Sequence, residues 1–175
     1  MNNSKATEFN LKLYCLHYNE CDPKKCTALK LKKFDLLKII NKVKGSLNKA
    51  LTLNPFSKKE VSIDDRKRIL KYGLIVIDCS WKTLLNIKYL NNEYARKLPP
   101  LMAANPVNYG RIGQLSSIEA LASALYISDF EDQAKEILSL FKWGESFMTL
   151  NESPLAEYKS ATSNEEVYKI EKEFF

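Results

Sequence analysis

The chain has 175 residues and a formal net charge of +6, with 45% hydrophobic and 27% charged residues. These values are close to the averages of soluble globular proteins, so they exclude general disorder and fibrous repeats and predict one compact unit with a sizeable core. No apolar run approaches the roughly 18 to 20 residues of a membrane span, and the polar start lacks a signal-peptide pattern. We therefore expect a cytoplasmic protein without a membrane partner.

The first third of the chain carries the excess positive charge. Residues 1–60 contain 13 lysines and 5 acids, whereas residues 61–175 contain 14 basic residues and 16 acids. A lysine-rich lobe attracts a polyanion such as nucleic acid over a Debye length of about 8 Å. A solvated lysine-rich surface explains the same composition, so charge alone leaves nucleic-acid binding open.

The first elements in chain order belong to this lysine-rich part. Alternation of apolar and polar residues predicts a strand over 9–17, and a loop with a turn at Asp22-Pro23 follows, with a basic exit. Apolar residues at roughly helical spacing over 35–51, interrupted by Gly45, predict a short helix.

The middle of the chain combines a capped helix with a strongly apolar strand. Ser62, followed by acids, predicts a helix N-terminus, and Gly73 predicts its end. The next four residues, LIVI, form a continuous apolar run that ends at Asp78 and predicts a central strand covered on both faces. Helical spacing resumes over 81–98.

Two helices are expected after that, and the tail over 161–175 is expected to form at best a short polar-then-charged helix. Ser116 and Glu119 have the spacing of a capping box, and a second helix is expected to begin near Asp129 and to end at Gly144. The expected buried stripes are Ile118, Leu121, Ala122 and Leu125 in the first helix, and Ala134, Ile137, Leu138 and Phe141 in the second.

Strands separated by helices predict an α/β chain. In such folds, ligands bind outside the carboxyl ends of the strands. This rule places the site at 78–81 and at the loop that follows Ala104.

The four cysteines are too few and too unevenly spaced for a disulfide framework, so reduced thiols are expected. Cys15, Cys21 and Cys26 lie close together, with His17 between them, but zinc sites favour short CxxC pairs that the chain lacks. We expect buried or half-exposed thiols and no metal.

The DCSW segment at 78–81 has candidates for chemistry. Partial burial makes Asp78 a credible general base, although a role as a helix cap is an equal alternative. Cys79 has no histidine nearby in the sequence, which argues against a Cys-His nucleophile. Trp81 is either a core residue or a platform for a flat or cationic ligand. Glycine-rich phosphate and dinucleotide motifs and the HExxH zinc motif are absent from the sequence.

Five segments occur in the order and at about the separations seen in the small-subunit ribosomal RNA aminocarboxypropyltransferases of archaea and eukaryotes, which the chain resembles over residues 9–158. The segments are DPKKCTALKL at 22–31, DCSW at 78–81, LPPLMAANPVNYG at 98–110, LSSIEALASALYI at 115–127 and FKWGESFMTLN at 141–151.

This resemblance implies a SPOUT-like α/β fold with a C-terminal trefoil knot. It places a small basic lobe, similar to the N-terminal segment of an RNase L inhibitor, at 1–60 and a knotted domain that binds S-adenosylmethionine (SAM) at 61–175. The segment 98–110 then contains a strand, Leu101 to Ala104, that delivers the chain to the cofactor pocket.

The resemblance also implies an activity. In this family, SAM donates its 3-amino-3-carboxypropyl group to N3 of a hypermodified uridine or pseudouridine in small-subunit rRNA during ribosome biogenesis. The expected partner is this rRNA or a pre-ribosomal particle, and the expected state is a monomer. The alternatives are a knotted RNA methyltransferase and a non-enzymatic RNA-binding assembly factor.

The family's cofactor contacts carry over residue by residue. Thr27 matches the position that holds the amino acid end of SAM, Ile77 matches a backbone contact, and Leu101 matches a backbone contact to the nucleoside end. Ser116 and Ala120 match positions at the start of the next helix, where Ala120 offers only backbone or packing contacts.

Two further positions match residues near the reacting centre. Trp81 matches an aromatic residue that packs against the sulfonium, since a ring face attracts a cation. Asp78 matches the family's acid, which we expect to accept the N3 proton or to orient the base.

Basic residues complete the expected site as phosphate contacts. The first group consists of Lys24, Lys25, Lys30, Lys32 and Lys33, and the second patch consists of Arg66, Lys67 and Arg68.

Overall fold

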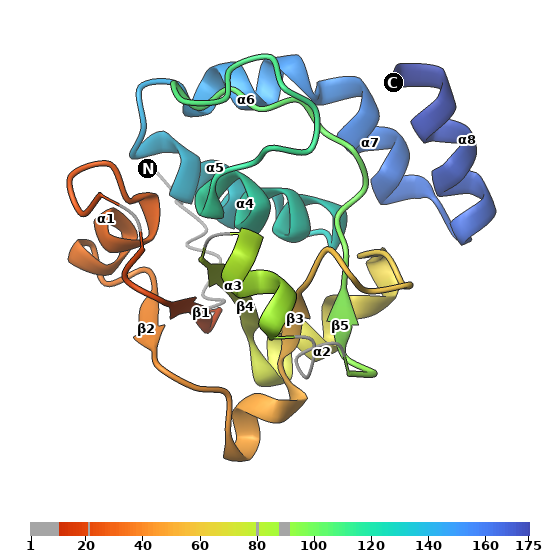
Figure 1. The fold of residues 1–175 in the computed structure, drawn as a ribbon. Coiled ribbons are helices and arrows are strands. Elements are labelled where there is room, and N and C mark those ends of the chain that lie inside the picture. Colours follow the sequence, from red (N-terminus) through yellow and green to blue (C-terminus); the bar gives the residue numbers. More distant parts are fainter. Residues whose placement is uncertain (1–10, 21, 80, 88–91) are drawn as a thin grey trace, which may run out of the picture.

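A parallel β-sheet is the centre of the molecule (Figure 1). The computed structural model describes residues 11–20, 22–79, 81–87 and 92–175. Within these residues the strand order is β2-β1-β4-β3-β5, which confirms the α/β class. The strands are β1 (Leu13–His17), β2 (Lys38–Ile40), β3 (Leu51–Leu53), β4 (Leu74–Asp78) and β5 (Ala95–Arg96).

Helices cover the sheet, and α5 to α8 form a further layer on the far side of α4 in Figure 1. The helices are α1 (Thr27–Lys33), α2 (Arg66–Tyr72), α3 (Trp81–Asn86), α4 (Ser117–Ile127), α5 (Glu131–Ser139), α6 (Gly144–Leu150), α7 (Glu152–Ser160) and α8 (Asn164–Phe174), with 3₁₀ turns η1 (Gly45–Lys49) and η2 (Ile63–Asp65). None of the helices in the described ranges is long and apolar enough to cross a membrane.

Strand β4 is the central strand, as its apolar run predicts. It pairs with β1 on one side and with β3 on the other. Leu74 and Val76 belong to the larger apolar core, which includes the buried face of α4, whereas Ile75 packs in a second cluster with Leu84 of α3. A strand with both faces buried needs apolar residues at successive positions, which is why the sequence shows a run here and no alternation.

The predictions for 18–51 were partly wrong. Residues 27–33, expected in a loop, form α1, which buries Ala28 and Leu31 at helical spacing beneath its exposed lysines. The expected helix over 35–51 is absent: Lys38–Ile40 pairs with β1 as β2, and η1 follows. An open edge of the sheet supplied the tertiary context that overrode the apparent helical spacing.

The expected strand from Leu101 to Ala104 was also wrong. This segment forms only one isolated antiparallel bridge, between Met102 and Ile112. Two of its backbone donors bond to side chains: the Met102 N–H donates to Asn151 Oδ1 at 2.8 Å, and the Ala104 N–H donates to Glu119 Oε1 at 2.7 Å. The Ala103 N–H between them donates to the Arg111 carbonyl at 3.0 Å.

The helix starts at Ser62 and Ser116 are confirmed. Both serines form capping boxes, with Asp65 and Glu119 respectively. The stripe expected in α4 is buried.

The expected ends of the remaining elements need correction. α5 ends at Ser139, and Gly144 begins α6 instead of ending α5. The tail forms the eleven-residue helix α8. Residues 9–10 of the expected first strand and 88–91 of the expected helix over 81–98 lie outside the described residues. The expected helix was partly wrong, because α3 ends at Asn86 and Ala95–Arg96 forms β5, which pairs with β3.

Candidate functional site

The parallel pairing of β1 and β4 brings two polar side chains to one edge of the sheet. His17 ends β1 and Asp78 ends β4, and the two residues are partners in the register. The Tyr18 N–H donates to the Asp78 backbone oxygen at 3.1 Å and extends this pairing beyond the strands. Both side chains therefore lie at the carboxyl edge, where ligands bind in α/β sheets.

A turn at Asp22 places Cys26 beside this edge. The Asp22 side chain accepts from the Lys24 N–H at 3.0 Å, and the Asp22 backbone oxygen accepts from the Cys26 N–H at 3.0 Å. Cys26 then caps α1 and donates from Sγ to Asp78 Oδ2 at 3.3 Å.

His17, Cys26 and Asp78 form a compact cluster that the sequence did not predict. His17 Nε2 lies 3.5 Å from Cys26 Sγ and 3.6 Å from Asp78 Oδ2, while Nδ1 contacts Asn19 Oδ1 at 2.9 Å. In the described part of the chain, this is the one group of three His, Cys, Asp or Glu side chains whose possible ligand atoms lie close enough together to hold a metal ion. Each member contacts the other two.

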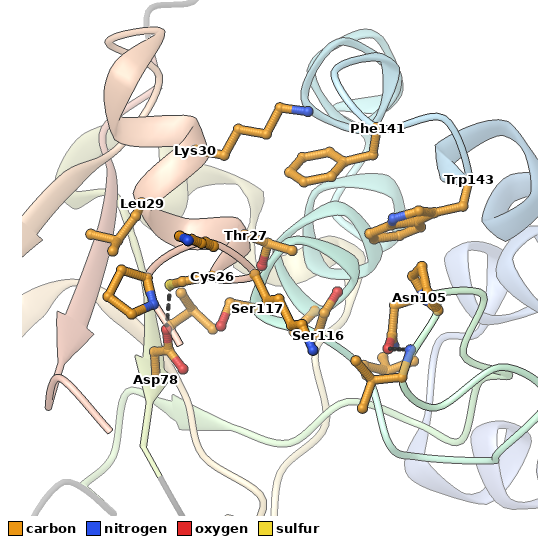
Figure 2. A pocket seen from close by; sticks show the side chains of 18 of the residues that line it. Cys26, Thr27, Leu29, Lys30, Asp78, Asn105, Ser116, Ser117, Phe141 and Trp143 are labelled. Atoms are coloured by element: carbon orange, nitrogen blue, oxygen red, sulfur yellow. Dashed lines mark hydrogen bonds between the residues drawn. The ribbon is translucent and has the colours of Figure 1, made fainter. Parts of the chain in front are cut away.

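A cavity of about 900 Å³ opens beside this cluster (Figure 2). Cys26 and Asp78 line one side, and Phe141 and Trp143 lie across from them. Between these sides, the lining includes Thr27, Leu29, Ile77, Ser116, Ser117 and Ala120.

A second cavity of about 480 Å³ adjoins the first. The two share five lining residues: Val76, Ile77, Cys79, Leu115 and Ala120. The second cavity is lined largely by apolar side chains, among them Leu53, Leu84 and Leu98, with Lys97 and Glu171 at its polar end.

Cys79 lies where the two cavities meet. Burial, together with the nearby carboxyls of Glu20 and Asp78, raises the pKa of the Cys79 thiol to about 11. A thiol with such a pKa is protonated at neutral pH and is a poor nucleophile. The structure thus agrees with the sequence-based argument against covalent catalysis at Cys79.

Five of the seven predicted catalytic and cofactor residues line the first cavity: Thr27, Ile77, Asp78, Ser116 and Ala120. Leu101 is fully buried, is not part of the lining described for either cavity, and its carbonyl accepts from the Gly113 N–H at 2.9 Å. Trp81 begins α3, and its side chain lies outside the described part of the structure.

Glu119 holds the loop that borders the first cavity. This fully buried carboxylate accepts from the backbone N–H of Ala104, Asn105 and Ser116, and from the side chains of Asn105 and Ser116, at 2.7 to 2.9 Å. The Ser116 hydroxyl is therefore occupied by the capping box. The neighbouring Ser117 hydroxyl also lines the cavity and bonds to no group in the described ranges.

Four of the five predicted lysines of the first group line the cavity: Lys24, Lys25, Lys30 and Lys33. Lys32 is exposed outside this lining. Lys30 is the one with a defined position, because its Nζ donates to the Leu140 carbonyl at 2.6 Å and lies 4.5 Å from the centroid of the Phe141 ring.

The second basic patch lies outside this cavity lining. Arg66 pairs with Asp129 at 3.2 Å and lies over the Phe130 ring. Arg68 donates to the Lys49 carbonyl and lies 3.8 Å from the centroid of Tyr94. These two arginines thus have structural contacts of their own, whereas Lys67 is exposed.

Sequence reasoning missed His17 and Cys26 as partners of Asp78, and Phe141 and Trp143 as cavity residues. His17 carried a usable signal, since it ends a predicted strand, as Asp78 does. Phe141 was assigned to the core because its spacing continued the stripe of α5.

Comparisons with protein families match two segments of the chain. Residues 51–175 match the model "Ribosome biogenesis protein, C-terminal", and residues 11–45 match "Possible Fer4-like domain in RNase L inhibitor". An iron–sulfur cubane needs four thiolates. The second segment contains three cysteines, and among its described residues Cys15 is buried in the apolar core, so the segment does not fit such a cluster.

Similar proteins cover nearly the whole chain. The 16S rRNA aminocarboxypropyltransferase of Methanosphaera stadtmanae is 44% identical over 168 residues, which are 94% of this chain and 97% of that protein. The protein of the same name from Thermoplasma volcanium is 46% identical over 163 residues, which are 93% and 98% of the two chains.

A solved structure extends the similarity to the fold. The SAM-dependent rRNA:acp-transferase Tsr3 from Vulcanisaeta distributa is 31% identical, with a TM-score of 0.80 over 94% of this chain and 97% of that one. Identity at this level over nearly the full length, together with the matching fold, shows that the chain belongs to the family of 16S rRNA aminocarboxypropyltransferases.

Proposed function

We propose that this protein transfers the 3-amino-3-carboxypropyl group of SAM to N3 of a uridine or pseudouridine in small-subunit rRNA, during ribosome biogenesis. The observation that carries the proposal is the placement of Asp78 in a large cavity with a basic rim, in a chain similar over nearly its full length to enzymes named for this transfer.

The two adjoining cavities fit the two chemically different ends of SAM. The second cavity is lined mainly by apolar residues, which suits an adenine ring, and the first adds lysines and hydroxyl groups that suit an amino acid group. Ile77 and Ala120 line both cavities and would border the middle of the molecule.

Within the first cavity, the hydroxyls of Thr27 and Ser117 are suited to hold the amino acid end. Ser116 and Ala120 would contribute through backbone and packing, because the Ser116 hydroxyl already bonds to Glu119. We propose Trp81 as the aromatic neighbour of the sulfonium, since a ring face attracts a cation. The family resemblance alone supports Leu101 as a backbone contact for the nucleoside end.

When bound, SAM supplies three electrophilic carbons around one sulfonium. The carbon that reacts is the one that the pocket holds in line with the nucleophile. The protein's part is to present the aminocarboxypropyl carbon towards the RNA side of the cavity and to keep the methyl group against apolar walls.

Asp78 is the residue we assign to the acceptor base. Its side chain is 19% exposed, and its Oδ2 contacts both Cys26 and His17. These contacts fix the orientation of a carboxylate that would accept the N3 proton or orient the base.

The proposal extends to the fold class, the domain boundaries, the oligomeric state and the location of the protein. We assign the fold to the SPOUT-like class with a C-terminal trefoil knot, with a basic lobe at 1–60 and a SAM-binding domain at 61–175. Both parts contribute strands to the one sheet, since β1, β2 and β3 precede residue 61 and β4 and β5 follow it. The protein would act as a monomer on rRNA or a pre-ribosomal particle in the cytoplasm.

Isotope labelling tests the function. Small-subunit RNA is incubated with the protein and SAM labelled either at the carboxyl carbon or at the methyl carbon. Carboxyl label in the RNA is the expected result, and mass spectrometry of the digested nucleosides identifies the modified base. Transfer of methyl label alone would show a methyltransferase, and absence of both labels would indicate an assembly factor.

Substitution of Asp78 tests its role. In single-turnover assays, we expect Asp78→Asn to slow transfer by about 10²- to 10⁴-fold, the usual range for loss of a general base, with SAM affinity unchanged. The control is Asp132→Asn, the same chemical change at an exposed position of α5. Transfer by Asp78→Asn at the wild-type rate would rule out the catalytic assignment.

A further inference from the structure

Phe141 and Trp143 form an aromatic wall of the first cavity. Their ring centroids lie 5.1 Å apart with an interplanar angle of 43°, and both side chains are only partly buried. Figure 2 shows both rings on the side of the cavity opposite Asp78. By contrast, Phe147 on the following helix is fully buried in the core.

The backbone that carries these rings is fixed. The Phe141 N–H donates to the Leu138 carbonyl at 2.9 Å, the Gly144 N–H donates to the Phe141 carbonyl at 2.9 Å, and the Phe147 N–H donates to the Trp143 carbonyl at 3.1 Å. A side chain at Gly144 would place Cβ 2.0 Å from the Leu138 oxygen, so only glycine permits this approach. The wall is therefore preorganised, which lowers the entropic cost of binding.

The wall offers a hydrogen-bond donor and a nearby positive charge to a ligand. Within the described ranges, no hydrogen bond involves the Trp143 indole N–H, and an indole donor usually finds a partner when a ligand buries it. Lys30 Nζ adds positive charge 4.5 Å from the Phe141 centroid. A flat ring, an N–H donor and a nearby cation suit a pyrimidine base with carbonyl acceptors and an attached phosphate.

The position of the wall distinguishes the acceptor base from the adenine of SAM. Neither aromatic residue is part of the lining described for the second, apolar cavity. Both line the first cavity together with Asp78 and the lysine rim, which consists of Lys24, Lys25, Lys30 and Lys33. If adenine occupies the second cavity, Phe141 and Trp143 remain accessible to the RNA.

We infer that Phe141 and Trp143 are the stacking platform for the acceptor base, which is extruded from an unpaired RNA loop into the first cavity. This inference rests on the proposed function and adds to it the subsite that holds the reacting nucleotide. Extrusion is required because Asp78 is recessed in the cavity, and N3 of a stacked or paired uridine is out of its reach.

A double-mutant cycle between protein and RNA tests the subsite. The RNAs are a small-subunit hairpin and a set in which each loop uridine in turn is replaced by an abasic nucleotide. We expect Trp143→Ala to weaken binding of the intact hairpin by about ten- to a hundredfold, the range for one base–aromatic stack. On the RNA that lacks the acceptor base, the same substitution should change affinity by less than about twofold, since the stack is already gone.

Two control variants separate the loss of stacking from other effects of removing an aromatic side chain. Trp143→Phe keeps a ring and should retain most of the affinity, while Tyr168→Ala removes an exposed aromatic side chain on α8 and should leave affinity unchanged. SAM affinity measured by calorimetry should be the same in all three variants, which also shows that they fold.

An equal loss with every RNA, or no loss with any, would overturn the stacking assignment. Because binding is measured without turnover, this outcome is separate from failure of the proposed function, which the labelling experiment detects with the wild-type protein. Coupling between Trp143 and one loop uridine supports the inference, and that uridine should be the one that acquires the label.

Discussion

Asp78 shows how much of the site is decided by the surroundings of single residues. Its Oδ2 accepts from Cys26, which lies 52 residues earlier in the chain, and faces His17 from the neighbouring strand. The acid itself was predictable because it ends an apolar run. Its partners were not, since the pairing of β1 with β4 and the turn before α1 both had to be known.

At the same scale, the surroundings of Glu171 predict how the stability of the fold depends on pH. Burial and the nearby Glu60 carboxyl raise the pKa of Glu171. The folded state therefore holds this proton more tightly than the unfolded state, so stability falls as pH rises from the unfolded pKa of about 4.3 through the folded one. Glu60 Oε2 is buried without a hydrogen-bond partner in the described structure, and a proton on Glu171 supplies a donor.

Glu171→Gln removes this titration and keeps a donor. We expect a Tm a few degrees above the wild type at pH 8 and a difference near zero at pH 4. Calorimetry at the two pH values measures both. Glu173→Gln is the matched control on the exposed side of α8, and it should shift Tm equally at both. A Tm gain for Glu171→Gln that did not depend on pH would contradict this account.

At the scale of elements, the loop before α4 is held by side chains instead of by a sheet. Glu119 receives bonds from the backbone on both sides of this loop, and Asn151 bonds to both the N–H and the carbonyl of Met102. Two prolines at 99 and 100 offer no backbone donors, which favours such an arrangement over a strand.

We predict that Glu119→Gln destabilises the protein by about 2–5 kcal/mol, because the amide would direct N–H groups at buried donors and leave them unpaired. Urea unfolding followed by circular dichroism measures the change. Glu145→Gln, an exposed residue in the first turn of α6, should cost less than about 0.5 kcal/mol. Similar costs for the two variants would show that the Glu119 network contributes little.

At the scale of the whole molecule, the fold places four of the 13 lysines of the first 60 residues around one cavity. Lys24 and Lys25 lie on its rim, beside the carboxyl edge of the sheet. A polyanionic substrate is therefore attracted to the side of the molecule that carries the candidate active site.

Salt dependence checks this placement. If Lys24 and Lys25 each contact a phosphate, the double variant Lys24→Gln, Lys25→Gln should reduce the slope of log K against log salt by about 1.4 to 1.8, at about 0.7 to 0.9 for each contact. The control is Lys135→Gln, Lys172→Gln, which removes the same charge from α5 and α8. Filter binding at several salt concentrations gives both slopes, and equal slopes for the two double variants would show that the lysine rim makes no phosphate contact.

The sequence by itself determined the features that arise from local patterns. The central strand, both capping boxes and the buried face of α4 follow from short-range periodicity and capping chemistry, and five ordered segments were enough to identify the family resemblance. These signals are readable because each depends on neighbours a few residues away.

Only the tertiary structure decided the features that depend on distant partners. Lys38–Ile40, within the expected helix over 35–51, formed β2 because β1 offered an edge. Two backbone donors of the expected strand at 101–104 bond to Glu119 and Asn151, and Phe141, partly buried against the core, also lines the cavity with Trp143. In each case a contact across the fold outweighed the local preference, since propensity contributes less than about 1 kcal/mol per residue and tertiary packing and buried hydrogen bonds contribute more.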